Sequence, residues 1–355
     1  GTVLWPVVTK LVEKRTRRRK EEERRTKYQQ YIAGMQAKIQ EEGSRQAEIL
    51  NENIVTLDDC IERIRNTRRT LWERMFRHND FLMLRLGMGS LPLDAEFRFP
   101  ERKFSVEEDP LQDELYRLCN SPHELASVPI SLSLRDSHVM GVIGDRENVA
   151  AYVRGLVLQI SALHSYDDVK MVFLYDGSES DQWDFAKWLP HTWNEQHNVH
   201  FMAGSHQDAR EISILLERVF ASRQEQEGEE LLPWYVVFAL DRKLGSQTEL
   251  ARQILSEKEC RGFSLVTAYD ELRFLPKECT KVVELHGKDA YLYDQDDIYG
   301  QREYLYPDIM VSASCRDLSV QLGNTFLQAA SRRELPDMLT FLEMFGVGKA
   351  EHLNA

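Results

Sequence analysis

The most informative absences in this sequence concern membrane spans, cysteine pairs and helix breakers. No run of about eighteen consecutive apolar residues occurs, so we expect none of its segments to cross a membrane. The five cysteines form no Cys-x-x-Cys pair, which predicts reduced thiols packed as small apolar side chains. A chain of 355 residues is long enough for one large domain or two smaller ones.

Acidic residues outnumber basic ones overall, but the basic residues gather at one end. The formal net charge is −13, yet residues 1–40 hold eleven Lys and Arg against four Glu, a net +7 that leaves −20 for the remainder. An acidic body disfavours nucleic-acid binding, because phosphate contacts need clustered Lys and Arg. The basic arm permits contact with a membrane surface or with nucleic acid.

The first residues join a short apolar stretch to this basic arm. Residues 3–11 are mostly apolar and include Trp5, and a cluster of Lys and Arg follows. A tryptophan between an apolar stretch and a run of bases is typical of the cytoplasmic end of a transmembrane helix. The start of a solvated basic helix explains the same residues equally well.

The stretch from Thr9 to Thr70 has no proline and only two glycines. Good helix formers dominate it, and its apolar residues recur at helical spacing. We predict two long helices with a break near Gly43 and Ser44. They would form a stalk or an antiparallel hairpin, most simply a structural spacer.

The remainder predicts an open α/β sheet. Alternating residues from Phe81 to Leu86 predict a strand that ends in a tight turn at Gly87 and Gly89. The other predicted strands and helices alternate, as they do when parallel strands are covered by helices. The predicted strands are 129–134, 234–241, 262–269 and 281–285, and the predicted helices are 113–120, 207–226 and 247–258.

A βαβ unit from Val139 to Asp176 organises this sheet. An apolar run ends at Gly144, a helical pattern follows over residues 149–160, and a second apolar run ends at Asp176. Strand, glycine turn and helix in this order predict a parallel unit of the P-loop or Rossmann type. In P-loop proteins that turn cradles phosphate.

The phosphate-binding residues of such a turn are missing. A working loop needs a Lys that reaches the phosphates and a Ser or Thr on Mg²⁺. The candidate cofactor-binding residues at this position instead include two acids, which would repel a triphosphate, and one cation. They are Gly144, Asp145, Arg146, Glu147 and Asn148. We therefore favour a structural turn over a hydrolytic loop.

Asp241 is the candidate catalytic residue, because it follows a buried strand as a Walker B aspartate does. Arg242 follows it where a catalytic Glu is common, so Asp241 is a degenerate Walker B candidate or the cap of a loop. Residues 181–200 hold three Trp and three His without metal-ligand spacing, which predicts packing aromatics and no metal site.

The strand order, the Leu-Pro-His triplet at 189–191 and the strands 234–241 and 262–268 resemble an FtsK/SpoIIIE-type ATPase domain. The flanks at 71–92 and 335–348 are similar to one region of EssC/EccC proteins, the motors of bacterial type VII secretion. That region lies between the transmembrane helices and the first full ATPase domain. The resemblance implies a stalk followed by a degenerate ATPase-like domain.

The resemblance also places the missing loop residues. Full ATPase domains of this family carry Gly-Ser-Gly-Lys-Ser before a helix ending in Arg-Gly-Leu-Val, and this chain has Arg154-Gly-Leu-Val157. Counting back puts Val149 at the Lys position and Ala150 at the Ser position. The implied domains are a basic stalk at 1–70, a degenerate ATPase domain at 71–334 and a linker at 335–355.

The implied role is a part of the motor on the cytoplasmic side of the bacterial plasma membrane. The implied partners are membrane components of the secretion channel, downstream ATPase domains of the same protein, secreted proteins indirectly, and the membrane through preceding transmembrane helices. No cofactor and no specific nucleic acid are expected. The alternatives are an ATPase that binds ATP through Arg146 and Mg²⁺ through Asp241, an FtsK-like DNA translocase fragment, and an inert scaffold.

Overall fold

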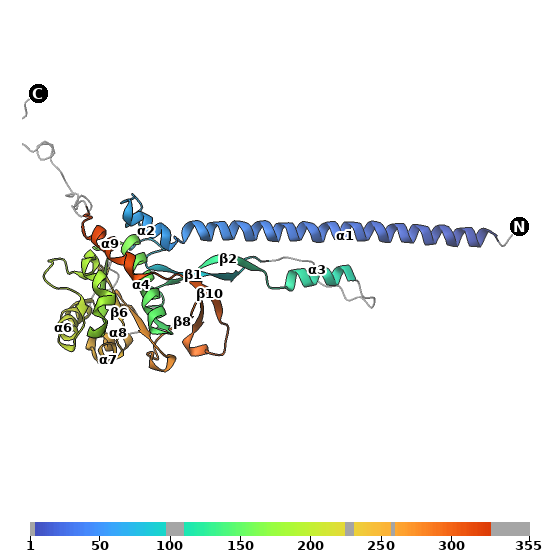
Figure 1. The fold of residues 1–355 in the computed structure, drawn as a ribbon. Coiled ribbons are helices and arrows are strands. Elements are labelled where there is room, and N and C mark those ends of the chain that lie inside the picture. The colour runs from blue at the N-terminus through green and yellow to red at the C-terminus, as the bar shows by residue number, and fades with distance from the viewer. Residues whose placement is uncertain (1–3, 97–109, 224–230, 257–259, 328–355) are drawn as a thin grey trace, which may run out of the picture.

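The computed structural model describes residues 4–96, 110–223, 231–256 and 260–327 (Figure 1). It is a mixed α/β domain built on one ten-stranded sheet, from which a long N-terminal helix projects. The helices are α1 (Leu4–Asn53), α2 (Leu57–Arg65), α3 (Pro110–Asn120), α4 (Arg146–Leu163), α5 (Ser180–Trp183), α6 (His206–Arg223), α7 (Arg242–Gln247), α8 (Glu249–Ser256) and α9 (Ser312–Gly323). The strands are β1 (Met83–Pro92), β2 (Glu124–Ser133), β3 (Val139–Ile143), β4 (Val169–Leu174), β5 (Met202–Ala203), β6 (Trp234–Ala239), β7 (Phe263–Tyr269), β8 (Lys281–His286), β9 (Asp289–Asp294) and β10 (Glu303–Pro307).

The sheet confirms the predicted open, mostly parallel architecture. Its order is β2-β1-β10-β9-β8-β3-β7-β6-β4-β5. The strands from β8 to β5 in this order are parallel neighbours, as expected for βαβ units. The strands β9, β10, β1 and β2 extend the sheet with antiparallel pairs. The sequence did not predict β9 and β10.

Successive residues of the central strands point to opposite faces of the sheet. On β6, Val236 and Phe238 pack on one face with α2, α4 and α9, whereas Tyr235 and Val237 pack on the other with α6, α7 and α8. Both faces are therefore covered by helices. Burying each such side chain stabilises the fold by roughly 1.5–3 kcal/mol before entropy costs.

The predicted break near Gly43 and Ser44 is wrong, because α1 runs unbroken through both residues (Figure 1). Gly43 packs against Leu125 of β2, so tertiary contact supports the helix where local propensity is weak. The helix instead ends before Thr56, whose side chain caps α2. The stalk alternative holds, since α2 packs on α4 and not back along α1.

The predicted glycine turn after Leu86 is also wrong, because β1 continues through Gly87 and Gly89 to Pro92. The glycines serve a close approach between strands. A Cβ atom on Gly87 would lie 2.1 Å from the backbone oxygen of Tyr306 in β10. The strand can therefore pair with β10 only if this position has no side chain.

Two further predicted elements change at their ends. The helix predicted over 247–258 begins earlier and is interrupted, as α7 ends at Gln247 and α8 spans Glu249–Ser256. The strand predicted to start at Pro129 begins at Glu124. The predicted linker 335–355 lies outside the described residues. Within the part of the chain that the structure describes, no helix is both long and apolar enough to span a bilayer.

Candidate functional site

The candidate site is a crevice of about 440 Å³ at the carboxyl ends of β6 and β7, beside the start of α4. In open α/β sheets this edge is where ligands bind, since loops and helix N-termini converge there. Polar and charged side chains dominate its lining. The lining residues are Arg146, Asp176, Glu179, Leu240, Asp241, Arg242, Tyr269, Asp270 and Phe274.

The loop that would cradle phosphate is too short to do so. The strand β3 ends at Ile143 and α4 begins at Arg146, so only Gly144 and Asp145 lie between them. A P-loop needs about six residues between its strand and its Lys to wrap backbone amides around a phosphate. Gly144 has a different use here, because a Cβ atom on it would lie 2.8 Å from the backbone oxygen of Leu285 in β8.

Arg146, one of the two arginines that line the crevice, is already paired. Its Nε atom donates to Glu179 Oε1 at 2.7 Å, and its Nη2 atom contacts the second carboxylate oxygen. It also donates to the backbone oxygen of Leu240 at 2.8 Å. The hydrogen bond that Arg146 donates to Glu179 raises the pKa of Arg146, although burial acts in the opposite direction. The Glu179 carboxylate is therefore already hydrogen-bonded to the guanidinium group that a phosphate would need to contact.

Asp241 caps a short helix, whereas the sequence predicted a degenerate Walker B residue or the cap of a loop. Its side chain accepts a hydrogen bond of 2.8 Å from the backbone N–H of Leu244, which makes it the N-cap of α7. Asp176 makes a similar local bond, since it accepts from the backbone N–H of Ser178 at 2.9 Å. That bond lowers the pKa of Asp176. Both acids thus complete helix starts at this edge of the sheet.

The other predicted loop residues do not converge on a ligand position. Asp145 and Glu147 are exposed, and Asp145 makes no side-chain bond to cap α4. Val149 and Ala150, at the predicted Lys and Ser positions, are buried in the core. The crevice lining has four acids and two arginines, a formal charge of −2 that disfavours a triphosphate.

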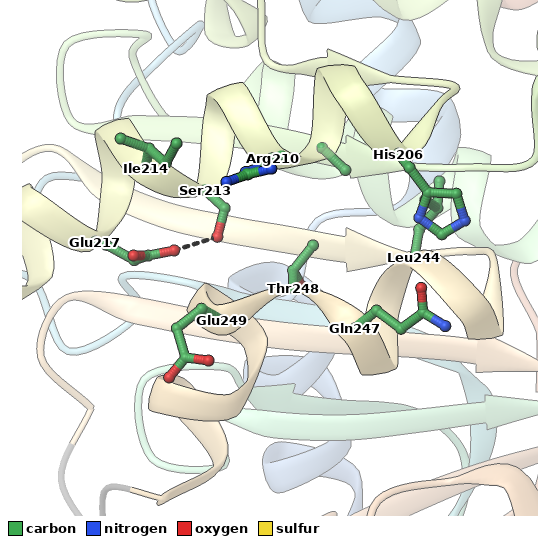
Figure 2. Close-up of a pocket in the computed structure, with 10 residues that line it drawn as sticks. His206, Arg210, Ser213, Ile214, Glu217, Leu244, Gln247, Thr248 and Glu249 are labelled. Carbon is green, nitrogen blue, oxygen red and sulfur yellow. Dashed lines mark hydrogen bonds between the residues drawn. The ribbon is translucent and has the colours of Figure 1, made fainter.

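A second cavity, of about 470 Å³, lies between α6 and the turn from α7 to α8 (Figure 2). Figure 2 shows Ser213 on α6 directed toward this turn and hydrogen-bonded to Glu217 at 2.5 Å. Ser213 Oγ also accepts from the backbone N–H of Leu250 at 3.1 Å. These bonds assign its hydroxyl to helix packing.

The Trp and His residues of 181–200 divide into two groups. Trp183 and His191 are buried in the core, as predicted, and His191 Nε2 lies 2.9 Å from the backbone oxygen of His164. Trp193 stacks on His200 with 4.2 Å between ring centroids, nearer the surface. Among the described residues, no three His, Cys, Asp or Glu side chains are placed to hold a metal ion.

Sequence reasoning missed Glu179, the residue that defines the crevice. It lies 33 positions after Arg146, in the one-turn helix that follows β4, and no motif connects the two. The only available signal was topological, because the carboxyl ends of parallel strands meet at one edge. Because Arg146 follows one parallel strand and Glu179 follows the next strand along the chain, the two were candidates for an ion pair.

These observations define an open, mostly parallel α/β domain with a two-residue connection between β3 and α4. No protein-family model matches the chain. The type VII secretion system protein EssC of Staphylococcus aureus strain MSSA476 is 21% identical over 362 residues, which cover 99% of this chain and 24% of EssC. The ESX secretion system protein EccC of Geobacillus thermodenitrificans is 22% identical over 379 residues, with the same coverage of both chains.

The homologues of this chain are thus EssC and EccC proteins of type VII secretion, which confirms the predicted resemblance. The chain spans about a quarter of the length of these relatives. Among solved structures, the cytoplasmic domain of Thermomonospora curvata EccC superimposes with a TM-score of 0.46 and 12% identity, over 76% of this chain and 34% of that one. EssC ATPases 2 and 3 of Geobacillus thermodenitrificans give 0.45 and 9%, over 72% and 51%.

Proposed function

We propose that this chain is the membrane-proximal cytoplasmic part of a type VII secretion motor and that its α/β domain is a pseudo-ATPase. The domain docks on membrane components of the secretion channel and couples them to ATPase domains of the same protein. Secreted proteins are then handled indirectly, and nucleic acid is not a partner. The sequence relationship to EssC and EccC over 99% of the chain supports the motor role.

The observation that carries the pseudo-ATPase part is the Arg146–Glu179 pair beside a two-residue loop. A hydrolytic site must leave its phosphate-binding cation available and must surround the phosphates with amides. Here the Glu179 carboxylate pairs with Arg146, and the Walker-B-like Asp241 caps α7. The crevice therefore retains the position of a nucleotide site without its chemistry.

The coupling part is supported by how α1 joins the sheet. Gln46 on α1 donates to the backbone oxygen of Asp94 at 2.7 Å and accepts from its N–H at 3.1 Å, just beyond the end of β1. Ile32 packs with Leu115 of α3. Near the N-terminus of α1, Trp5 is 78% exposed beside the basic arm, which supports a location next to the membrane.

Titration calorimetry of the chain with ATP and Mg²⁺, paired with a phosphate-release assay, tests the pseudo-ATPase. We expect neither heat nor phosphate. Phosphate release that is lost in Asp241→Ala would instead establish the ATPase alternative. The control is Asp294→Ala, which alters an acid outside the crevice.

A secretion assay with the full-length protein tests the motor role. Deletion of residues 71–334 should abolish secretion, because the coupling domain is lost. Arg146→Ala and Asp241→Ala should leave secretion intact, because neither residue performs catalysis. Secretion that survives the deletion would refute the coupling role, and secretion lost in Asp241→Ala alone would refute the pseudo-ATPase.

A further inference from the structure

An apolar groove of about 690 Å³ lies between α9 and the segment that follows α5. It is larger than the nucleotide-position crevice and is lined mainly by aromatic and apolar groups. We call it the aromatic groove. Its lining residues are Lys187, Trp188, Pro190, Trp193, His197, His200, Val320, Gly323 and Asn324.

The walls of the aromatic groove are held in place by packing. Trp193 stacks on His200 at 4.2 Å between centroids and donates its indole N–H to the backbone oxygen of Lys187 at 3.2 Å. Burial lowers the pKa of His200 to about 4, so this ring is uncharged at neutral pH. On the other wall, a Cβ atom on Gly323 would lie 2.6 Å from the backbone oxygen of Trp188. The close approach of α9 thus requires this glycine.

The groove presents apolar surface to solvent. The side chain of Trp188 is 42% exposed, and that of Phe326, just past α9, is 79% exposed. Exposed large apolar side chains at and near a hollow in the surface are typical of a binding surface. A volume in the range of small-ligand pockets can take several apolar side chains of a helix laid into the groove.

The chain itself supplies a segment that matches. The groove wall includes Gly323 and Asn324, and the N–H of Leu327 bonds to the hydroxyl of Tyr166 at 3.1 Å, so the described part of the chain ends three residues past the groove wall. Their sequence has apolar residues spaced for one face of a helix, at Leu335, Met338, Leu339, Leu342 and Phe345.

Residues 328–345 are long enough for the segment 335–345 to reach the aromatic groove. Residues 328–334 can extend over roughly 24 Å, at about 3.4 Å per residue. A helix over residues 335–345 would be roughly 16 Å long, at about 1.5 Å per residue. The tether also favours this occupant over a free peptide, because a segment on a short linker has an effective concentration in the millimolar range.

We propose that the aromatic groove binds residues 335–345 of the same chain, with their apolar face against Trp188 and Val320. The tail is then docked on the body of the domain. This assignment rests on the groove and on the tail sequence, and it holds whether or not the chain takes part in secretion.

Hydrogen exchange of the 355-residue chain, read by mass spectrometry, tests the proposal. We expect the amides of 335–345 to exchange at least tenfold more slowly than unstructured amides. Leu339→Asp combined with Leu342→Asp should remove this protection and should speed exchange in 188–200. The matched control is Leu353→Asp, which lies in the same tail eight residues beyond the segment 335–345.

The groove side is tested by Trp188→Glu and Val320→Glu, both at positions that are not fully buried. Each should release the tail while the urea midpoint of the domain stays unchanged. Tail amides that exchange freely in the unaltered chain would overturn the proposal, as would protection that survives both groove variants. Protection that disappears on fifty-fold dilution, together with a dimer in chromatography, would overturn it in favour of a second copy's tail.

Discussion

Arg85 and Asp308 form an ion pair with 2.7 Å between Nε and Oδ2, and it joins β1 to the segment after β10. Arg85 is 7% exposed, and burial raises the pKa of Asp308 despite the neighbouring guanidinium. The backbone N–H and oxygen of Arg85 are both bonded to the side chain of Gln159 on α4, at 2.9 Å each. One residue thus fixes the antiparallel extension of the sheet to the central helix.

We expect Asp308→Ala and Arg85→Ala each to lower the free energy of unfolding by about 3–5 kcal/mol, because each leaves a buried charge without its partner. The double variant Arg85→Ala, Asp308→Ala should lose much less than the sum of the two single losses, since no charge stays buried. Urea denaturation of the four proteins measures this coupling. Additive losses would show that the pair does not interact energetically.

Glu179→Ala should lower the free energy of unfolding by about 1–2 kcal/mol, because Arg146 loses charge-assisted hydrogen bonds in a partly buried position. The control is Glu249→Ala, which breaks an ion pair with Arg252 whose side chains are more than half exposed. That change should cost less than about 0.5 kcal/mol. Equal effects in urea denaturation would contradict the structural role given to Glu179.

Gly87→Ala should destabilise the domain by roughly 2–3 kcal/mol, because the new methyl group collides with the backbone of β10. Gly34→Ala is the opposite case, since nothing lies within 4 Å of the added atom and the residue sits inside α1. It should stabilise the helix by roughly 0.5–1 kcal/mol. Thermal melts followed by circular dichroism measure both, and a harmless Gly87→Ala would mean that β10 is not packed as described.

Stability should fall as the pH drops from about 6.5 to 5. Burial lowers the pKa of His164 and of His191 to about 3, so the folded state keeps both neutral. The unfolded chain gains those protons near the ordinary value of about 6.5, and the unfolding free energy then decreases by up to about 1.4 kcal/mol per pH unit for each histidine.

The variant His164→Gln should remove about a third of this pH dependence, because His200, whose pKa burial lowers to about 4, contributes beside His191. Gln does not titrate and can still accept from the N–H of Leu82, as His164 Nε2 does at 3.0 Å. Urea denaturation at pH 7, 6 and 5 gives the slopes. A flat profile for the unaltered chain would show that the two histidines are not buried neutral.

The central parallel strands could be predicted because both of their faces are buried, which makes them read as short apolar runs. The strands β9 and β10 were missed, since their apolar runs are only four and three residues long, at 290–293 and 304–306, and lie among charged and turn residues. The continuity of α1 through Gly43 was also out of reach, because it depends on contact with Leu125, more than eighty residues away.

The sequence predicted where in the sheet the crevice lies, but not which side chains pair within it. Gly144 and Arg146 were located correctly at the end of a strand, because an apolar run followed by glycine is a local pattern. Which carboxylate faces Arg146 depends on the order of strands in the sheet. That order places the end of β4 near the start of α4, and no local pattern records it.

The length of α1 has a mechanical consequence. Its 50 residues make a rod of roughly 75 Å, at about 1.5 Å per residue. In the described structure, the residues of α1 that pack on α3 lie from Tyr28 onward. The part of α1 before Tyr28 therefore extends about 36 Å beyond these contacts. A rotation of about 10° where the rod meets α3 would move its tip by about 6 Å on this length. A helix of this length would turn small angular changes at the domain surface into displacements as wide as a strand spacing.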